Sequence, residues 1–421
     1  MRFLVFCLMI TMFCNPLAAQ RTLIVDRLNR PGTEFLDMQP AVDAALNGDV
    51  ILVRTVDFRA TGLFYEAPTV DNKSVTIRGD LPRPPVVGQF VVRNLAAGRR
   101  VTISGFRNGD DAYANSGTRA APYRGVGVLN CNGIVVLDQM VIGVPNTNSV
   151  SVYRFNGHGQ PQPILVQDSS AVYVSNSIVH QCYTSSAVYC DAGRLFATDC
   201  CFGGGTVEQL QPWPGTVMVI RGGEITMTDC TAVSTDGWWY APLGLWNYAS
   251  GAVVMAGGVV RCAGNTSLIG GWTLYFQDAA VEDYNTAFPT GPVYVDPRTR
   301  VEGGFGFYTP PTWGPVAGAS WTVDEPSQTV TLRQYTEPGA FAVFAMGNLQ
   351  PTPTSLPQGL LYLNPGSIHV LGLSSNSTGD HTLTLSIAPL PAIGTSVTVQ
   401  GAELTPNGTI RLTQPIIPGR Y

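Results

Sequence analysis

The residues best suited to bind a ligand are aromatic and gather in one stretch of the chain. Between 236 and 248 lie Asp236, Trp238, Trp239, Tyr240, Trp246, Asn247 and Tyr248. Flat aromatic rings stack on the C–H faces of sugar rings, and the polar side chains at 236 and 247 can hydrogen-bond to hydroxyl groups. We therefore expect a carbohydrate-binding platform here. The alternative is a loop that packs its own aromatic residues on the flank of the molecule.

Two neighbouring acids, Asp110 and Asp111, precede Gly157-His158-Gly159 and are the first candidates for catalysis. Glycoside hydrolysis needs two carboxylates, since one protonates the leaving oxygen while the other activates water. These two acids, however, follow Asn108-Gly109, a turn sequence in which solvated acids are common. We interpret them as turn residues and identify no catalytic residue.

Other reactive side chains show no pattern that indicates a metal or a cofactor. The histidines at 158, 180, 369 and 381 do not form a close pair with metal-ligand spacing, and no Cys-x-x-Cys is present. The sequence also lacks a Gly-x-Ser-x-Gly motif, a phosphate-binding loop and a dinucleotide fingerprint. We expect neither a metal site nor a cofactor.

The N-terminal residues 1–19 are typical of a secretory signal peptide. Arg2 is followed by an apolar run over 3–13 and by small residues at Ala18-Ala19. The run is shorter than the about 20 residues that span a bilayer. We expect a protein that is secreted or held at the cell surface, without insertion into the membrane.

Seven cysteines follow that segment and lie within strand-like runs: Cys131, Cys182, Cys190, Cys200, Cys201, Cys230 and Cys262. An odd number leaves at least one thiol unpaired within the chain, and export makes disulfides possible. We favour burial of these residues as small apolar side chains over a disulfide framework.

The composition favours strands and turns and argues against a nucleic-acid partner. Only 13% of residues are charged, whereas the chain has 46 glycines and 31 prolines. The formal net charge is −5, and no basic stripe that would bind a polyanion is evident.

A repeated pattern decides the fold class. It consists of an alternating strand, a Gly or Ala turn, a second alternating strand and an Asp or Asn turn, and its copies cover 126–138, 164–176, 187–199, 217–229 and, shortened, 253–262. One copy cannot bury its apolar face alone, but stacked copies share a continuous core. The pattern predicts an all-β, right-handed parallel β-helix.

Within these copies, side chains should alternate between the core and the surface. Leu195, Val219 and Ile225 are predicted core residues. Arg194, Arg221 and Arg261 are predicted to face outward on different coils.

The start of the chain resembles the N-terminal cap of the pectin-lyase-like β-helix superfamily. A strand at 22–26, a helix near 36–46 that is stopped by Asn47-Gly48, and a strand at 50–53 carry this resemblance. It covers about residues 22–300 and implies a parallel β-helix. The superfamily includes polysaccharide lyases, hydrolases and esterases as well as surface proteins without catalysis. The Arg-x-Lys of its polygalacturonase-like members is missing, because Lys73 is the sole lysine.

We expect four parts along the chain: the signal peptide at 1–19, the β-helix at 20–301, a Gly/Pro-rich linker at 302–318 and a C-terminal β-sandwich at 319–421. Short strands near 328, 341, 360, 381, 396 and 408, with Pro, Gly and Asn turns between them, predict the sandwich. Residues 356–421 resemble a β module at the ends of exported bacterial proteins, which implies an accessory role in stability, attachment or sorting.

Two hypotheses on function follow. The first is an exported, non-catalytic protein that binds polysaccharide or forms structural surface material. The alternative is a polysaccharide lyase or glycoside hydrolase of the pectin-lyase-like superfamily. The missing motifs favour the first, whose partner would be a polysaccharide.

Overall fold

The computed structural model describes most of the chain between residues 20 and 416. The described residues are 20–57, 61, 63–80, 83–108, 125–143, 163–180, 186–203, 217–234, 239–240, 245–246, 251–270, 281–283, 291–303, 311–324, 327, 329–357, 359–386 and 398–416. The predicted signal peptide therefore lies outside them.

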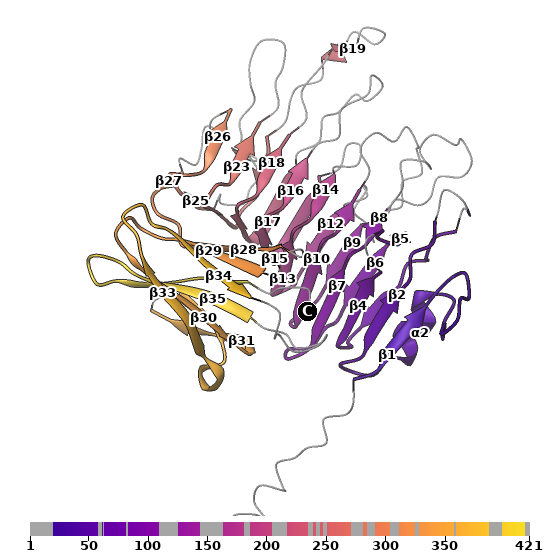
Figure 1. Ribbon diagram of the computed structural model, residues 1–421. Helices are drawn as coiled ribbons and strands as arrows, with labels where there is room; N and C mark the ends of the chain where they lie inside the picture. The colour runs from indigo at the N-terminus through magenta and orange to yellow at the C-terminus, as the bar shows by residue number, and fades with distance from the viewer. Residues whose placement is uncertain are drawn as a thin grey trace, which may run out of the picture.

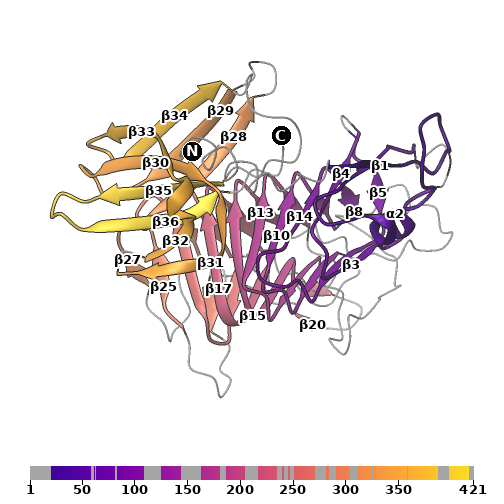
Figure 2. The same cartoon turned by 90° about the horizontal axis from the view of Figure 1, so that it is seen from below.

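Parallel strands stacked in three rows form the body of the molecule (Figures 1 and 2). One row runs β1–β2–β4–β7–β10–β13–β15–β17–β22–β25–β27, and a second runs β3–β6–β9–β12–β15–β17–β21–β24. The third is a separate sheet in the order β5–β8–β11–β14–β16–β18–β23–β26. Strands from successive coils pair in register and parallel in each row, which is the architecture of a parallel β-helix.

The strands of the first two rows, which are joined through the long β15 and β17, have the following bounds: β1 Thr22–Val25, β2 Val50–Val53, β3 Thr69–Asp71, β4 Val75–Gly79, β6 Phe90–Arg93, β7 Arg100–Ser104, β9 Val126–Leu129, β10 Ile134–Asp138, β12 Ile164–Gln167, β13 Ala171–Ser175, β15 Val188–Thr198, β17 Met218–Thr228, β21 Val253–Met255, β22 Val259–Ala263, β24 Val281–Asp283, β25 Val293–Val295 and β27 Thr312–Trp313. Those of the third row are β5 Val86–Val87, β8 Arg107–Asn108, β11 Val141–Ile142, β14 Ile178–His180, β16 Cys201–Gly203, β18 Thr231–Val233, β23 Ser267–Ile269 and β26 Arg300–Glu302.

A short helix covers the N-terminal end of the stack, where the sequence predicts a cap. Helix α2, Met38–Ala44, begins after Asp37, whose side chain accepts a hydrogen bond from the Met38 N–H. It ends earlier than predicted, because Ala45 adopts an extended conformation. Gly48 has a φ of 96°, but it belongs to the turn that leads into β2. Met38, Ala41 and Val42 close the apolar core at this end.

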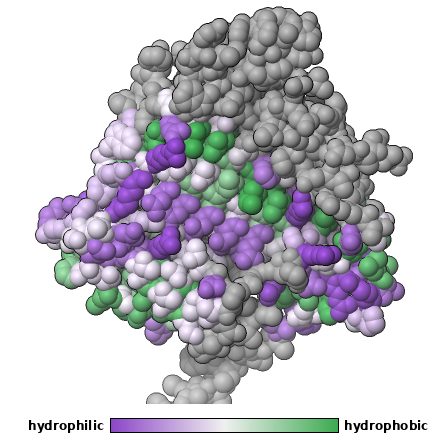
Figure 3. Space-filling model, turned by 45° about the horizontal axis from the view of Figure 1, so that its top comes forward, coloured by the Kyte–Doolittle hydropathy of each residue, from purple (hydrophilic) through white to green (hydrophobic). Residues whose placement is uncertain are grey.

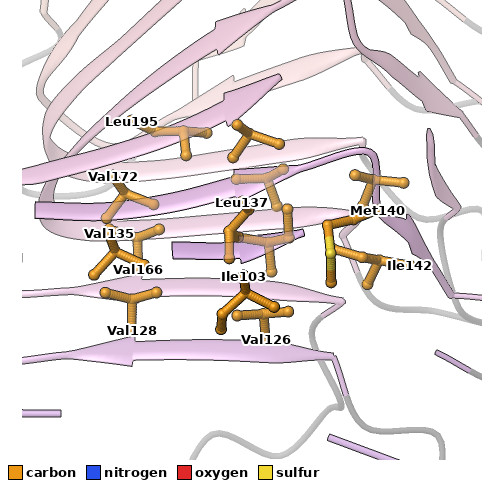
Figure 4. Packing of buried hydrophobic residues seen from close by; sticks show 14 of the residues in the cluster. Ile103, Val126, Val128, Val135, Leu137, Met140, Ile142, Val166, Val172 and Leu195 are labelled. Carbon is orange, nitrogen blue, oxygen red and sulfur yellow. The ribbon is translucent and has the colours of Figure 1, made fainter. Parts of the chain in front are cut away.

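The core is one continuous column of apolar side chains along the stack, and Figure 4 shows its middle part. Leu195 and Ile225 are fully buried, as predicted. Val219 was predicted wrongly: Met218 and Ile220 are the buried residues, and Val219 is half-buried between them.

The physical reason for this error is a corner inside β17. Gly222 and Gly223 both have positive φ, and the chain bends there. Even-numbered side chains point inward before the corner and odd-numbered ones after it, so a single alternation cannot be carried through the strand.

The predicted Asp/Asn turn is a ladder of residues in the left-handed conformation. Gln139, Asn176, Asp199 and Asp229 occupy this position on successive coils, with φ between 47° and 54°. In the first of these coils the turn residue is therefore Gln139 and not Asp138. Asp and Asn tolerate this backbone because their short side chains hydrogen-bond locally.

All cysteines that the structure describes have free thiols. Cys131, Cys190, Cys200, Cys230 and Cys262 are buried, as predicted, whereas Cys201 is exposed. Cys182 lies outside the described residues. Three of the buried thiols donate to the carbonyl of the residue two positions earlier, so they also satisfy turn backbone: Cys131, Cys200 and Cys230.

Two antiparallel sheets face each other in the C-terminal part, the gold region of Figure 1. One contains β28 Gly318–Asp324, β29 Thr329–Tyr335 and β34 Asp380–Ser386, and the other contains β33 His369–Ser375, β30 Phe341–Gly347, β35 Thr398–Leu404 and β36 Ile410–Ile416. Strands β31 Leu349–Leu356 and β32 Gly359–Leu363 form a hairpin beside them. Trp321, Leu332, Ala342 and Phe344 belong to the shared core, so the fold class is the predicted one.

The predicted linker, 302–318, contains one more strand of the stack. β27, Thr312–Trp313, pairs in parallel with β25, and β28 then begins at Gly318.

Within the described residues, no helix is long and apolar enough to cross a membrane. Figure 3 shows one face of the molecule, on which hydrophilic residues form most of the described surface and hydrophobic residues gather in smaller patches.

Candidate functional site

A cleft of about 390 Å³ lies between the outer face of the β-helix and the C-terminal module. Its walls come from β15, β17, β22 and β25 on one side and from β32 and β36 on the other, with residues 315–317 between them. This volume lies within the range of small-molecule binding sites.

The β-helix wall is a column of outward-facing side chains. Backbone register places Phe196, Thr226, Arg261 and Tyr294 side by side on four successive strands. Their inward neighbours, such as Ile225, are buried in the core, so alternation sends this column to the surface.

An acid and two arginines meet in this wall. Arg261 donates from Nε to Glu224 Oε1 at 2.9 Å, and Arg194 Nε lies 4.0 Å from Glu224 Oε2. The Arg261 guanidinium also lies over the Tyr294 ring, 4.6 Å from its centroid. The ring and the charged groups are thus held in fixed relative positions, with Arg261 contacting both.

The opposite wall comes from the C-terminal module. Tyr362 packs edge-on against Phe196 with 6.0 Å between ring centroids, and Phe196 stacks in turn on Tyr173 at 4.9 Å. Arg411 lines the same wall and donates to Glu403 Oε1 at 3.1 Å. The cleft therefore exists only while the module is docked on the β-helix.

The groups in this cleft can both stack on and hydrogen-bond to a polyhydroxylated ring. Tyr294 offers partly exposed aromatic surface, and Glu224 and Arg261 offer an acceptor and donors for hydroxyl groups, whereas Tyr362 is buried against Phe196 and closes the opposite wall. Glu224 is the only carboxylate among the described residues that line the cleft.

The three arginines face outward, as predicted, but two of them converge. Arg194 and Arg261 meet at Glu224, whereas Arg221 lies apart, with its guanidinium 5.7 Å from the centre of the Tyr189 ring. Sequence alone did not indicate the convergence.

The predicted aromatic platform is described only in part. Strands β19 Trp239–Tyr240 and β20 Leu245–Trp246 form an antiparallel hairpin in which Trp239 pairs with Trp246. Asp236, Trp238, Asn247 and Tyr248 lie outside the described residues, as do Asp110, Asp111 and 157–159. The platform stays a prediction.

Replacing Trp239 with Ala distinguishes the two interpretations of that hairpin. On a sugar platform, we expect loss of polysaccharide retention with an almost unchanged melting temperature. Flank packing instead predicts a cavity and a loss of about 3–5 kcal/mol in the free energy of unfolding. Affinity electrophoresis and a thermal melt on the same variant measure both quantities. A melt lowered to that extent, with retention unchanged, would contradict the platform.

Metal-binding residues are not gathered anywhere in the part of the chain that the structure describes: no group of three or more His, Cys, Asp or Glu side chains could hold an ion.

The fold and the cleft define a class of protein, a parallel β-helix that carries a docked β-sandwich. No family model matches the chain, and no curated protein matches it. Solved structures that it resembles include phage tailspikes. Tailspike protein gp49 from Pseudomonas phage LKA1 is 12% identical with a TM-score of 0.21, over 80% of this chain and 65% of that one. The enzymatically active domain of tailspike protein 2 from bacteriophage CBA120 is 10% identical with a TM-score of 0.17, over 88% and 61%.

This chain thus spans less than two thirds of the length of either tailspike chain.

Proposed function

We propose that this chain is an exported, non-catalytic protein that binds polysaccharide in the cleft between the β-helix and the C-terminal module. The observation that carries the proposal is the arrangement of Tyr294, Arg261 and Glu224 opposite Tyr362. Apolar ring faces next to fixed hydrogen-bonding groups are what a sugar ring needs for stacking and for orientation. The predicted signal peptide supports a location outside the cytoplasm.

The charge balance of the cleft favours neutral or weakly acidic glycans. Glu224 offsets part of the charge of Arg194 and Arg261, and Arg411 is paired with Glu403. A strongly polyanionic chain would need more unpaired cationic groups than these.

The alternative, a lyase or hydrolase of the pectin-lyase-like superfamily, makes a different prediction for the same experiment. The purified protein is tested against neutral and acidic polysaccharides, and both retention and chain cleavage are measured. Our proposal predicts retention without new reducing or unsaturated ends. New ends that accumulate with time would establish the enzyme, and absence of retention on every polysaccharide would contradict the binding function.

A further inference from the structure

The junction that holds the C-terminal module on the β-helix is centred on two acids of the turn ladder. Asp199 and Asp229 occupy the same turn position on adjacent coils, where strands stack about 4.8 Å apart. Both face strands β28 and β29 of the module. The proposed binding function makes no use of these acids.

Asp229 accepts hydrogen bonds from both sides of the junction. Its Oδ2 accepts hydrogen bonds from Ser320 Oγ at 2.5 Å and from Tyr335 Oη at 2.9 Å, and both donors belong to the module. Its Oδ1 accepts from the Asn265 N–H of the next coil at 2.9 Å. Both carboxyl oxygens of Asp229 therefore accept hydrogen bonds, two of them from the module.

Asp199 is not satisfied in the same way. The Trp321 N–H of β28 donates to its carboxyl group, but Oδ2 is buried without a hydrogen-bond partner. Burial and the nearby Asp229 raise the pKa of Asp199 to about 7, and Arg333 of β29 lowers it less. Two adjacent, partly buried carboxyl groups repel each other when both are ionised.

Other charged groups at the junction lie around Tyr335. Arg298 of the β-helix donates to the carbonyls of Thr336 and Thr378, and its guanidinium lies 5.6 Å from the centre of the Tyr335 ring. The nearby carboxylate of Asp380 in β34 contributes to a raised pKa of Tyr335. Arg298 thus links the β-helix to the module, but none of these groups donates to Oδ2 of Asp199.

We propose that Asp199 and Asp229 form a proton-dependent latch, in which the neutral form of Asp199 favours docking of the C-terminal module on the β-helix. A proton on Asp199 removes the repulsion from Asp229. The C-terminal wall of the cleft moves with the module, so the latch also controls access to that site. This last consequence rests on the proposed function, whereas the latch itself does not.

The sign of the pH dependence follows from the two states of Asp199. Undocking exposes this carboxyl group to water, where its pKa returns toward the ordinary 3.8. The docked state therefore binds the proton more tightly. Docking is strongest below about pH 4, weakens as the pH rises toward about 7 and levels off above that value. The docking constant changes by at most about tenfold per pH unit in this window.

Hydrogen exchange of the Trp321 amide reports the docking equilibrium directly, because its acceptor lies across the junction. We expect its protection factor in the full-length protein to fall at least about tenfold between pH 5 and pH 8. The Phe344 amide, in the core of the module, should keep its protection. A parallel fall at Phe344 would mean unfolding of the module and would overturn the latch.

Variants separate the role of this acid from a general effect of pH. Asp199→Asn should have the same Trp321 protection at pH 5 and pH 8, and Asn176 shows that Asn is compatible with this backbone conformation. Asp168→Asn is the matched control, because Asp168 has the same conformation, with φ 46°, but is exposed and lies in the turn between β12 and β13. Unchanged protection in the wild type, or a pH dependence retained in Asp199→Asn, would overturn the proposal. Polysaccharide is absent from this experiment, so failure of the binding function leaves its result intact.

Discussion

Replacing Ile225 with Asp is expected to lower the free energy of unfolding by at least about 4 kcal/mol. Ile225 is fully buried in the continuous core, between Leu195 and Val260 on the neighbouring strands. The substitution removes apolar contacts and places a carboxyl group where no donor satisfies it. Thermal and urea unfolding followed by circular dichroism measure the change.

Val219→Asp is the matched control, because Val219 lies on the same strand but on its outward face. The free energy of unfolding should fall much less in Val219→Asp than in Ile225→Asp. Equal losses in the two variants would mean that the change of alternation at Gly222-Gly223 is wrong.

Replacing Gly264 with Ala is expected to undock the C-terminal module. Gly264 follows Asp229 in the turn ladder and has a φ of 61°. A Cβ atom there would lie 2.4 Å from a ring carbon of Tyr335 and 2.5 Å from Asp229 Oδ1. Relief of that clash requires movement of Tyr335, a buried residue of the module. An alanine in this left-handed backbone conformation also costs about 1–2 kcal/mol of free energy relative to glycine.

The protection factor of the Trp321 amide should then fall by more than about tenfold at every pH. Gly222→Ala is the control, because Gly222 has a similar φ of 69° but no atom nearer than 4.0 Å to the added Cβ. Full protection in Gly264→Ala would contradict the described junction.

The fold was predictable because its signal is local and repeated. Alternating strands with Gly and Asp turns recur along the chain, and each copy has the same requirement to bury one face. The error at Val219 arose because two glycines change the alternation inside one strand, and a period of two cannot reveal that change.

The cleft was not predictable in the same way. Phe196 and Thr226 hold the same position in successive copies, three residues before the turn acid, so one wall could have been found by aligning the copies. Tyr362 and Arg411 belong to the module, and nothing local in the sequence reports where the module docks. Long-range docking depends on contacts such as that of Tyr335 with Asp229, which are 106 residues apart.

Retention of a polysaccharide by Tyr294→Ala, compared with the wild type, tests the central claim most directly. The substitution removes the ring beneath Arg261 on the β-helix wall of the cleft. Tyr189→Ala is the matched control, since Tyr189 also lies beneath an arginine, Arg221, but outside the cleft. Melting temperatures are recorded for all three proteins. On a polysaccharide that the wild type retains, we predict at least about tenfold weaker binding by Tyr294→Ala and wild-type binding by Tyr189→Ala. Wild-type binding by Tyr294→Ala would contradict a glycan site in this cleft.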